Sequence, residues 1–144
     1  MWPRRIGSFV LAAAVTYVLA VISASLHVAA SLESMGAEVG FGTRLEMIAH
    51  DLGGMATSFL PMILIGLLVA FAVAALLLRW LPRYRHLLYT LAGAAAVVTI
   101  HLALNAAFDI TPVAVARSGV GLLVQGLCGA VGGYAYARFT AAPV

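Results

Sequence analysis

The sequence predicts an all-α integral membrane protein, a single domain (1–144) folded as a four-helix transmembrane bundle. Its mean hydropathy is +1.08, and 64% of its residues are hydrophobic. Only 9% are charged, against roughly a quarter in soluble domains. Four apolar stretches are each long enough to cross a hydrocarbon core, which takes about 20 helical residues. The chain shows no alternation of polar and apolar residues of the kind that marks membrane β-strands.

We expect the four spans near 6–30, 55–80, 86–108 and 112–138, with a long loop over 31–54. The first span also resembles a secretory signal peptide, because arginines precede its apolar run. We interpret it as a span. The second span is almost purely aliphatic, so we expect it to face lipid or a partner.

The long loop contains the signals of a short helix. The segment TRLE (43–46) fits a capping box, in which Thr43 caps the helix and Glu46 reaches back. The pair Gly53-Gly54 predicts its end. We expect this helix to lie along the membrane surface or to fold over the bundle as a lid.

Prolines mark two other positions. Pro61 lies early in the second span and predicts a kink there. Thr111 followed by Pro112 predicts an N-cap and a first helical residue, so the fourth span should begin at this point.

Charge predicts the orientation. Four spans place six arginines on one side of the membrane: Arg4, Arg5, Arg79, Arg83, Arg85 and Arg138. Every acidic residue and the other two arginines then lie on the opposite side: Glu33, Glu38, Glu46, Asp51, Asp109, Arg44 and Arg117. Short cytoplasmic loops carry the excess of positive charge in membrane proteins. We therefore expect both termini in the cytoplasm and the chain in a bacterial-type inner membrane.

Several functions are excluded by composition. The chain has no lysine, so it can form no Schiff base and has no P-loop. Cys128 is alone, which excludes an intramolecular disulfide and a C-x-x-C redox pair. The arginines form no basic helix face, so nucleic acid is not an expected partner.

Glycines in the fourth span predict close helix packing. Gly129 and Gly133 have the spacing that lets two helix backbones approach each other. We favour packing against the span 86–108 within the chain. A homodimer seam is the alternative.

A polar stripe runs along the third span. His101, Asn105 and Asp109 fall within an arc of about 80° on one helix face. Two other spans offer similar faces: Thr16, Ala20, Ser23 and His27 in the first, and Arg117, Gly121, Gln125 and Cys128 in the fourth. A charged group facing lipid costs about 2.5–3.5 kcal/mol or more. We therefore expect the three faces to meet inside the bundle, toward its outer side.

These residues predict a pocket that binds or passes a ligand. Its expected members are His27, His101, Asn105, Asp109, Arg117 and Gln125. A histidine changes charge near pH ~6.5, which suits a proton-coupled or cation-handling role, whereas an arginine suits an anion. Four spans are few for a transporter, so this function would require a dimer.

Three alternatives stay open. The polar residues could only fix helix packing in an accessory or scaffold subunit. His27 and His101 could ligate a b-type haem, or His27, His50, His101 and Asp51 a divalent metal, although their spacing matches no metal motif. Asp51 and Asp109 could form the carboxylate dyad of an intramembrane hydrolase.

Overall fold

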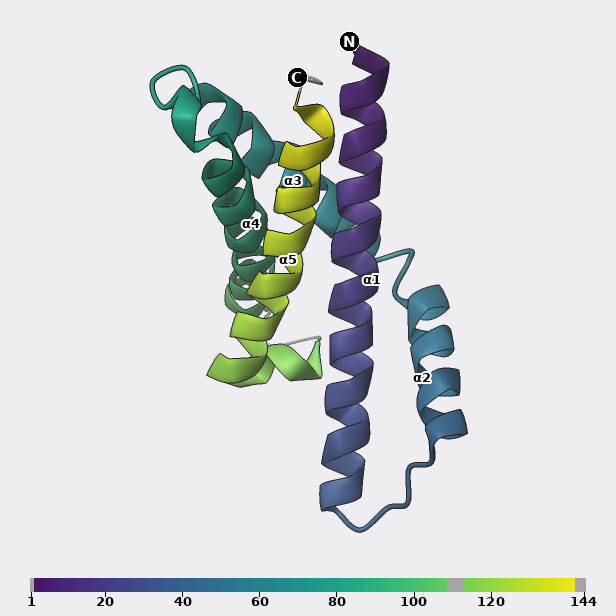
Figure 1. Cartoon of the computed structure of the whole chain (residues 1–144). Helices are drawn as coiled ribbons and strands as arrows, with labels where there is room; N and C mark the ends of the chain where they lie inside the picture. The colour runs from purple at the N-terminus through teal and green to yellow at the C-terminus, as the bar shows by residue number, and fades with distance from the viewer. Residues whose placement is uncertain (1, 109–112, 142–144) are drawn as a thin grey trace.

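The computed structural model describes residues 2–108 and 113–141. Within them it is all-α and has no strand (Figure 1). The helices are α1 (Trp2–Ser34), α2 (Phe41–Gly54), α3 (Phe59–Leu77), the 3-10 helix η1 (Pro82–Tyr84), α4 (Arg85–Phe108), the 3-10 helix η2 (Ala114–Arg117) and α5 (Gly119–Thr140). Four of them are long and apolar enough to cross a membrane: α1, α3, α4 with η1, and α5.

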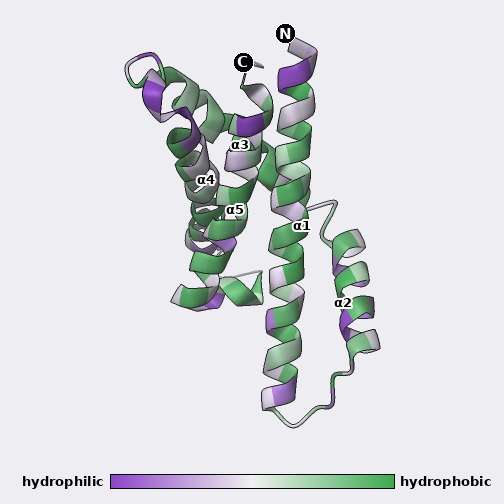
Figure 2. Cartoon of the chain, in the orientation of Figure 1, coloured by the Kyte–Doolittle hydropathy of each residue, from purple (hydrophilic) through white to green (hydrophobic). Residues whose placement is uncertain are grey.

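The four long helices form a bundle in which α5 lies between α1 and α4, and α3 packs mainly against α4 (Figure 1). Both termini lie at one end, where Arg4 donates a hydrogen bond to the carbonyl oxygen of Phe139 (2.9 Å). We call this the basic end, with Arg4, Arg5, Arg79, Arg83, Arg85 and Arg138. The opposite, acidic end carries Glu33, Glu38, Glu46 and Asp51. Hydrophobic residues fill most of the helices between the two ends (Figure 2).

Glycines allow α5 to touch its neighbours backbone to backbone. A Cβ atom on Gly129 would overlap the carbonyl oxygen of Gly93 in α4, and one on Gly133 would overlap that of Tyr89. On the adjacent face, a Cβ on Gly132 would overlap α1. The glycine motif of α5 is thus used in packing within the chain, the arrangement that the sequence favoured.

α1 is longer than a bilayer requires. Its 33 residues extend about 50 Å at ~1.5 Å per residue, against a hydrocarbon core of about 30 Å. α2 runs antiparallel beside the second half of α1 (Figure 1). No residue of α2 is buried. A helix attached in this way contributes little to the core.

Two predicted features of α2 have different outcomes. The helix ends at Gly54, as predicted. The predicted capping box is wrong, because Gly40 is the N-cap and Thr43 already lies in the first turn. The extended backbone of Gly40 lets the helix begin at Phe41, ahead of the threonine.

The predicted start of the fourth span and the predicted kink at Pro61 also need correction. α5 begins only after Ser118, whose extended backbone separates it from η2 and whose Oγ accepts a hydrogen bond from the Gly121 N–H (3.0 Å). A helix starting near 112 is therefore wrong, and Thr111-Pro112 lie outside the described residues. Pro61 is the third residue of α3. An N–H in the first turn has no partner in its own helix, so the position does not require a kink.

Candidate functional site

A polar cluster lies inside the bundle where α1, α4 and α5 meet. It consists of Ser23, His101, Gln125 and Cys128. The Gln125 side chain is fully buried, and its Nε2 donates to the Ala20 carbonyl oxygen (3.0 Å) and to the Ser23 Oγ (2.9 Å). Its Oε1 lies 3.4 Å from Nε2 of His101. These contacts bring together members of the three faces that the sequence expected to meet.

His101 is the centre of this cluster. Its side chain is only 2% exposed, and its ring centroid lies 5.7 Å from that of Phe59. Its Nε2 faces Gln125, but its Nδ1 is buried and has no hydrogen-bond partner in residues 2–108 and 113–141. Most buried polar atoms in proteins have such a partner. The unpartnered Nδ1 therefore requires an explanation.

The segment that joins α2 to α3 covers the cluster. Phe59 contacts the rings of both His101 and Tyr17, the latter at 6.4 Å between centroids. Two hydrogen bonds hold the preceding residues to α1: Tyr17 donates to the Leu52 carbonyl oxygen, and Ser25 donates to the Asp51 carboxylate, both at 2.6 Å. We call residues 51–59 the cover segment.

Sequence reasoning missed the part that α3 takes in the site. The second span was expected to face lipid, yet its first residue contacts His101. The signal was present, because Phe59, Ile63, Leu67 and Phe71 recur every four residues and are all buried. A purely apolar helix hides this face, since its lipid side is equally hydrophobic.

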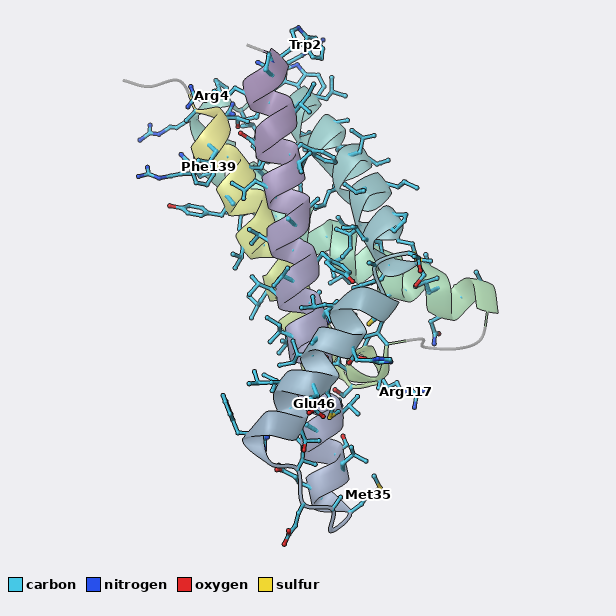
Figure 3. The ribbon with its side chains drawn as sticks, turned by 90° about the vertical axis from the view of Figure 1, so that its right-hand side faces the viewer. Trp2, Arg4, Met35, Glu46, Arg117 and Phe139 are labelled. Atoms are coloured by element: carbon cyan, nitrogen blue, oxygen red, sulfur yellow. The ribbon has the colours of Figure 1, made fainter. Side chains whose placement is uncertain are left out.

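A second site, which we call the His27 hollow, lies between the end of α1 and η2. It measures about 410 Å³ and is lined by His27, Val28, Ser31, Leu32, Met35, Ala114, Arg117 and Ser118. Arg117 is exposed there and lies toward the acidic end (Figure 3). The hollow opens to the surface and shares no lining residue with the polar cluster.

The predicted six-residue pocket is therefore divided. His101 and Gln125 belong to the polar cluster, whereas His27 and Arg117 line the His27 hollow. Asn105 is exposed on α4, one turn beyond His101. Asp109 lies outside the described residues.

The structure does not bring the residues of the predicted metal site together. Within residues 2–108 and 113–141, no group of three or more His, Cys, Asp or Glu side chains is placed to hold a metal ion. His50 is exposed on α2 and Asp51 is bonded to Ser25, while His101 is buried beneath Phe59. His27 and His101, the proposed haem ligands, lie in different surroundings.

Comparison of the chain with protein-family models, curated proteins and solved structures finds no match. The polar cluster, the cover segment and the two ends of the bundle are the observations from which a function can be argued.

Proposed function

We propose that the chain is a small membrane protein that binds or passes a ligand at His101. The unpartnered Nδ1 of this residue carries the proposal. A buried polar atom without a partner costs about 1–3 kcal/mol. Because Nε2 faces the Gln125 oxygen, which can only accept, Nδ1 is an acceptor, and a small polar ligand that donates a hydrogen bond to it supplies the missing interaction. Ionisable residues inside a membrane are rare and are commonly functional, which supports the same reading.

The cover segment is the gate of this site in our proposal. Phe59 lies against His101, and in this proposal it moves to give access to the imidazole. The segment is held by the bonds of Leu52 and Asp51 to α1, and it includes the last turn of α2, a helix without buried residues. Elements with few buried contacts open at low free energy. In our proposal the opening begins in this turn and must also displace Phe59, which is buried in the core.

We place the basic end in the cytoplasm of a bacterial-type cell, so that both termini are internal and the gate faces outward. The separation of charge supports this orientation. Arg4 and Arg85 lie at the end where the termini meet, and the four described carboxylates lie between residues 33 and 51. Arginine in short loops favours the cytoplasmic side.

Cysteine labelling tests the orientation. In a Cys128→Ser background, a cysteine at the exposed position Glu38 is expected to react with a membrane-impermeant maleimide in intact cells. A cysteine at the exposed position Arg83 is expected to react only after the inner membrane is opened. The reverse pattern would place the termini outside and contradict the proposed orientation.

A histidine replacement tests the function. His101→Phe removes Nδ1 but keeps an aromatic ring beside Phe59. We expect it to abolish proton flux into liposomes that contain the protein, or to remove the mass of a ligand retained in native mass spectrometry. His86→Phe is the matched control, because His86 is exposed at the start of the same helix. If both readouts are equal in wild type and His101→Phe, the ligand-binding function is wrong.

A structural role is the second candidate, and Gln125 is the observation that favours it. Its amide hydrogen-bonds to α1 on one side and faces α4 on the other, which fixes the register of three helices. Under this reading the protein is an accessory or scaffold subunit. His101→Phe would then lower thermal stability and change neither proton flux nor retained mass.

A further inference from the structure

We infer that a hollow at the basic end, remote from the proposed His101 site, binds an anionic membrane lipid through its phosphate headgroup. We call it the basic hollow. It measures about 660 Å³ and lies between α1, α3, α4 and α5. Its lining changes from apolar to charged, and the residues used below are Phe9, Phe71, Tyr89, Tyr136, Arg5 and Arg85.

Packed aromatic side chains form one wall of the basic hollow. Phe71 stacks on Tyr136 at 4.6 Å between ring centroids and contacts the edge of Tyr89 at 5.5 Å. Phe9 packs edge-on against Phe71 at 6.2 Å. Aliphatic residues of α3 and its C-cap, among them Leu68 and Leu78, continue the wall. Such a surface suits acyl chains, which interact with it as they do with other apolar groups.

The mouth of the hollow is positively charged. Arg85 donates from Nη2 to the Thr140 hydroxyl, and its guanidinium lies over the Tyr89 ring at 5.3 Å. Its Nε is buried and has no hydrogen-bond partner in the part of the chain that the structure describes. Arg5 lines the same mouth and is exposed. Two guanidinium groups therefore border one apolar hollow.

No described carboxylate can balance these charges. All four of them lie between residues 33 and 51, at the acidic end. A buried or half-buried cation without a counter-ion is costly, and guanidinium groups bind phosphate oxygens through paired N–H donors. Basic pockets between membrane helices on the cytoplasmic side bind anionic headgroups in this way.

The occupant that fits both halves of the hollow is a phospholipid with net negative charge. Its phosphate would accept from the guanidinium groups of Arg85 and Arg5, which line the hollow, and its acyl chains would lie along the aromatic wall. Free phosphate satisfies only the arginines. Trp2, which is exposed at the same mouth, marks the level of the headgroups, where tryptophan is enriched.

Quenching of Trp2 tests the inference. The chain has two tryptophans, so Trp80→Phe leaves Trp2, at the mouth of the hollow, as the only tryptophan, which can be excited selectively at the red edge of its absorption. The protein is reconstituted in zwitterionic vesicles that contain a brominated phospholipid, either anionic or zwitterionic. Stronger quenching by the anionic lipid is expected, and each of the two arginines is expected to contribute about a five-fold preference.

Arginine variants separate the basic hollow from the general charge of this end. Arg85→Gln and Arg5→Gln are expected to reduce the preference for the anionic lipid. Arg83→Gln is the matched control, because Arg83 lies at the same end but does not line the hollow. Arg5 is exposed and has no hydrogen bond to another helix within residues 2–108 and 113–141, so its variant repeats the test even if Arg85→Gln unfolds.

Three outcomes would overturn the inference. Equal quenching by the two lipids would show that the hollow does not select charge. An equal loss in Arg83→Gln and Arg5→Gln would assign the preference to the general charge of the basic end. Release of the anionic lipid by added inorganic phosphate would identify the phosphate alone, and not the lipid, as the ligand.

Discussion

Gly129→Val is expected to separate α4 from α5 and to lower the free energy of unfolding by about 3 kcal/mol or more. A Cβ at this position would overlap the carbonyl oxygen of Gly93 and lie 2.7 Å from the Cγ2 of Val97. The first of these atoms belongs to the backbone and cannot rotate away. The two helices must therefore move apart, and the contacts along their whole interface weaken.

Gly7→Val is the control for this substitution. Gly7 lies in a membrane-spanning helix as Gly129 does, but nothing lies within 4 Å of a Cβ built there. We expect its stability to remain close to that of the wild type. Unfolding can be followed by far-ultraviolet circular dichroism as the protein is heated in a mild detergent. Equal losses in the two variants would show that α4 and α5 are not in backbone contact.

Gln125→Leu is expected to lower the free energy of unfolding by about 1–3 kcal/mol. Leucine has a similar volume but makes no hydrogen bond. The change removes the bonds to the Ala20 carbonyl and the Ser23 hydroxyl, and it leaves His101 with no partner at either nitrogen. Ser31→Ala is the control, because this exposed hydroxyl donates to the His27 carbonyl oxygen of its own helix.

A double-mutant cycle with His101→Phe identifies which contacts of Gln125 matter. If leaving the imidazole without a partner causes part of the stability lost in Gln125→Leu, the double variant is expected to lose less stability than the sum of the single variants. The remainder belongs to the bonds that Gln125 makes to α1. Strict additivity would mean that the 3.4 Å approach of Gln125 to His101 contributes no stability.

The membrane-spanning helices were the most predictable part of the molecule. A backbone in hydrocarbon must satisfy its own hydrogen bonds, so an apolar stretch of sufficient length can only be a helix. The four candidate spans follow from this rule. Gly129 and Gly133 likewise predicted close packing, because only glycine permits such an approach.

Helix ends were harder to predict because two signals compete locally. Thr111-Pro112 and Ser118 are both acceptable starts for α5, and the chain uses Ser118, after a separate 3-10 turn. Likewise, Thr43 is a good cap, yet Gly40 allows an earlier start. Local preferences of about 1 kcal/mol cannot decide between positions so close together.

The candidate site was only partly predictable, because periodicity gives a face but not its surroundings. His101 and Asn105 share a face of α4, yet the first is buried and the second is exposed. The depth of each depends on how far the neighbouring helices extend. The cover segment reaches His101 through Phe59, which lies 42 positions earlier in the sequence. No local pattern in the sequence encodes a tertiary contact of this kind.

α1 has a mechanical consequence that its length makes unavoidable. After Pro3 and Gly7 its 33-residue chain contains no proline or glycine, and sharp kinks in helices arise mostly at such residues. One continuous helix therefore joins the contacts of α2 at one end of the molecule to the Arg4–Phe139 contact at the other.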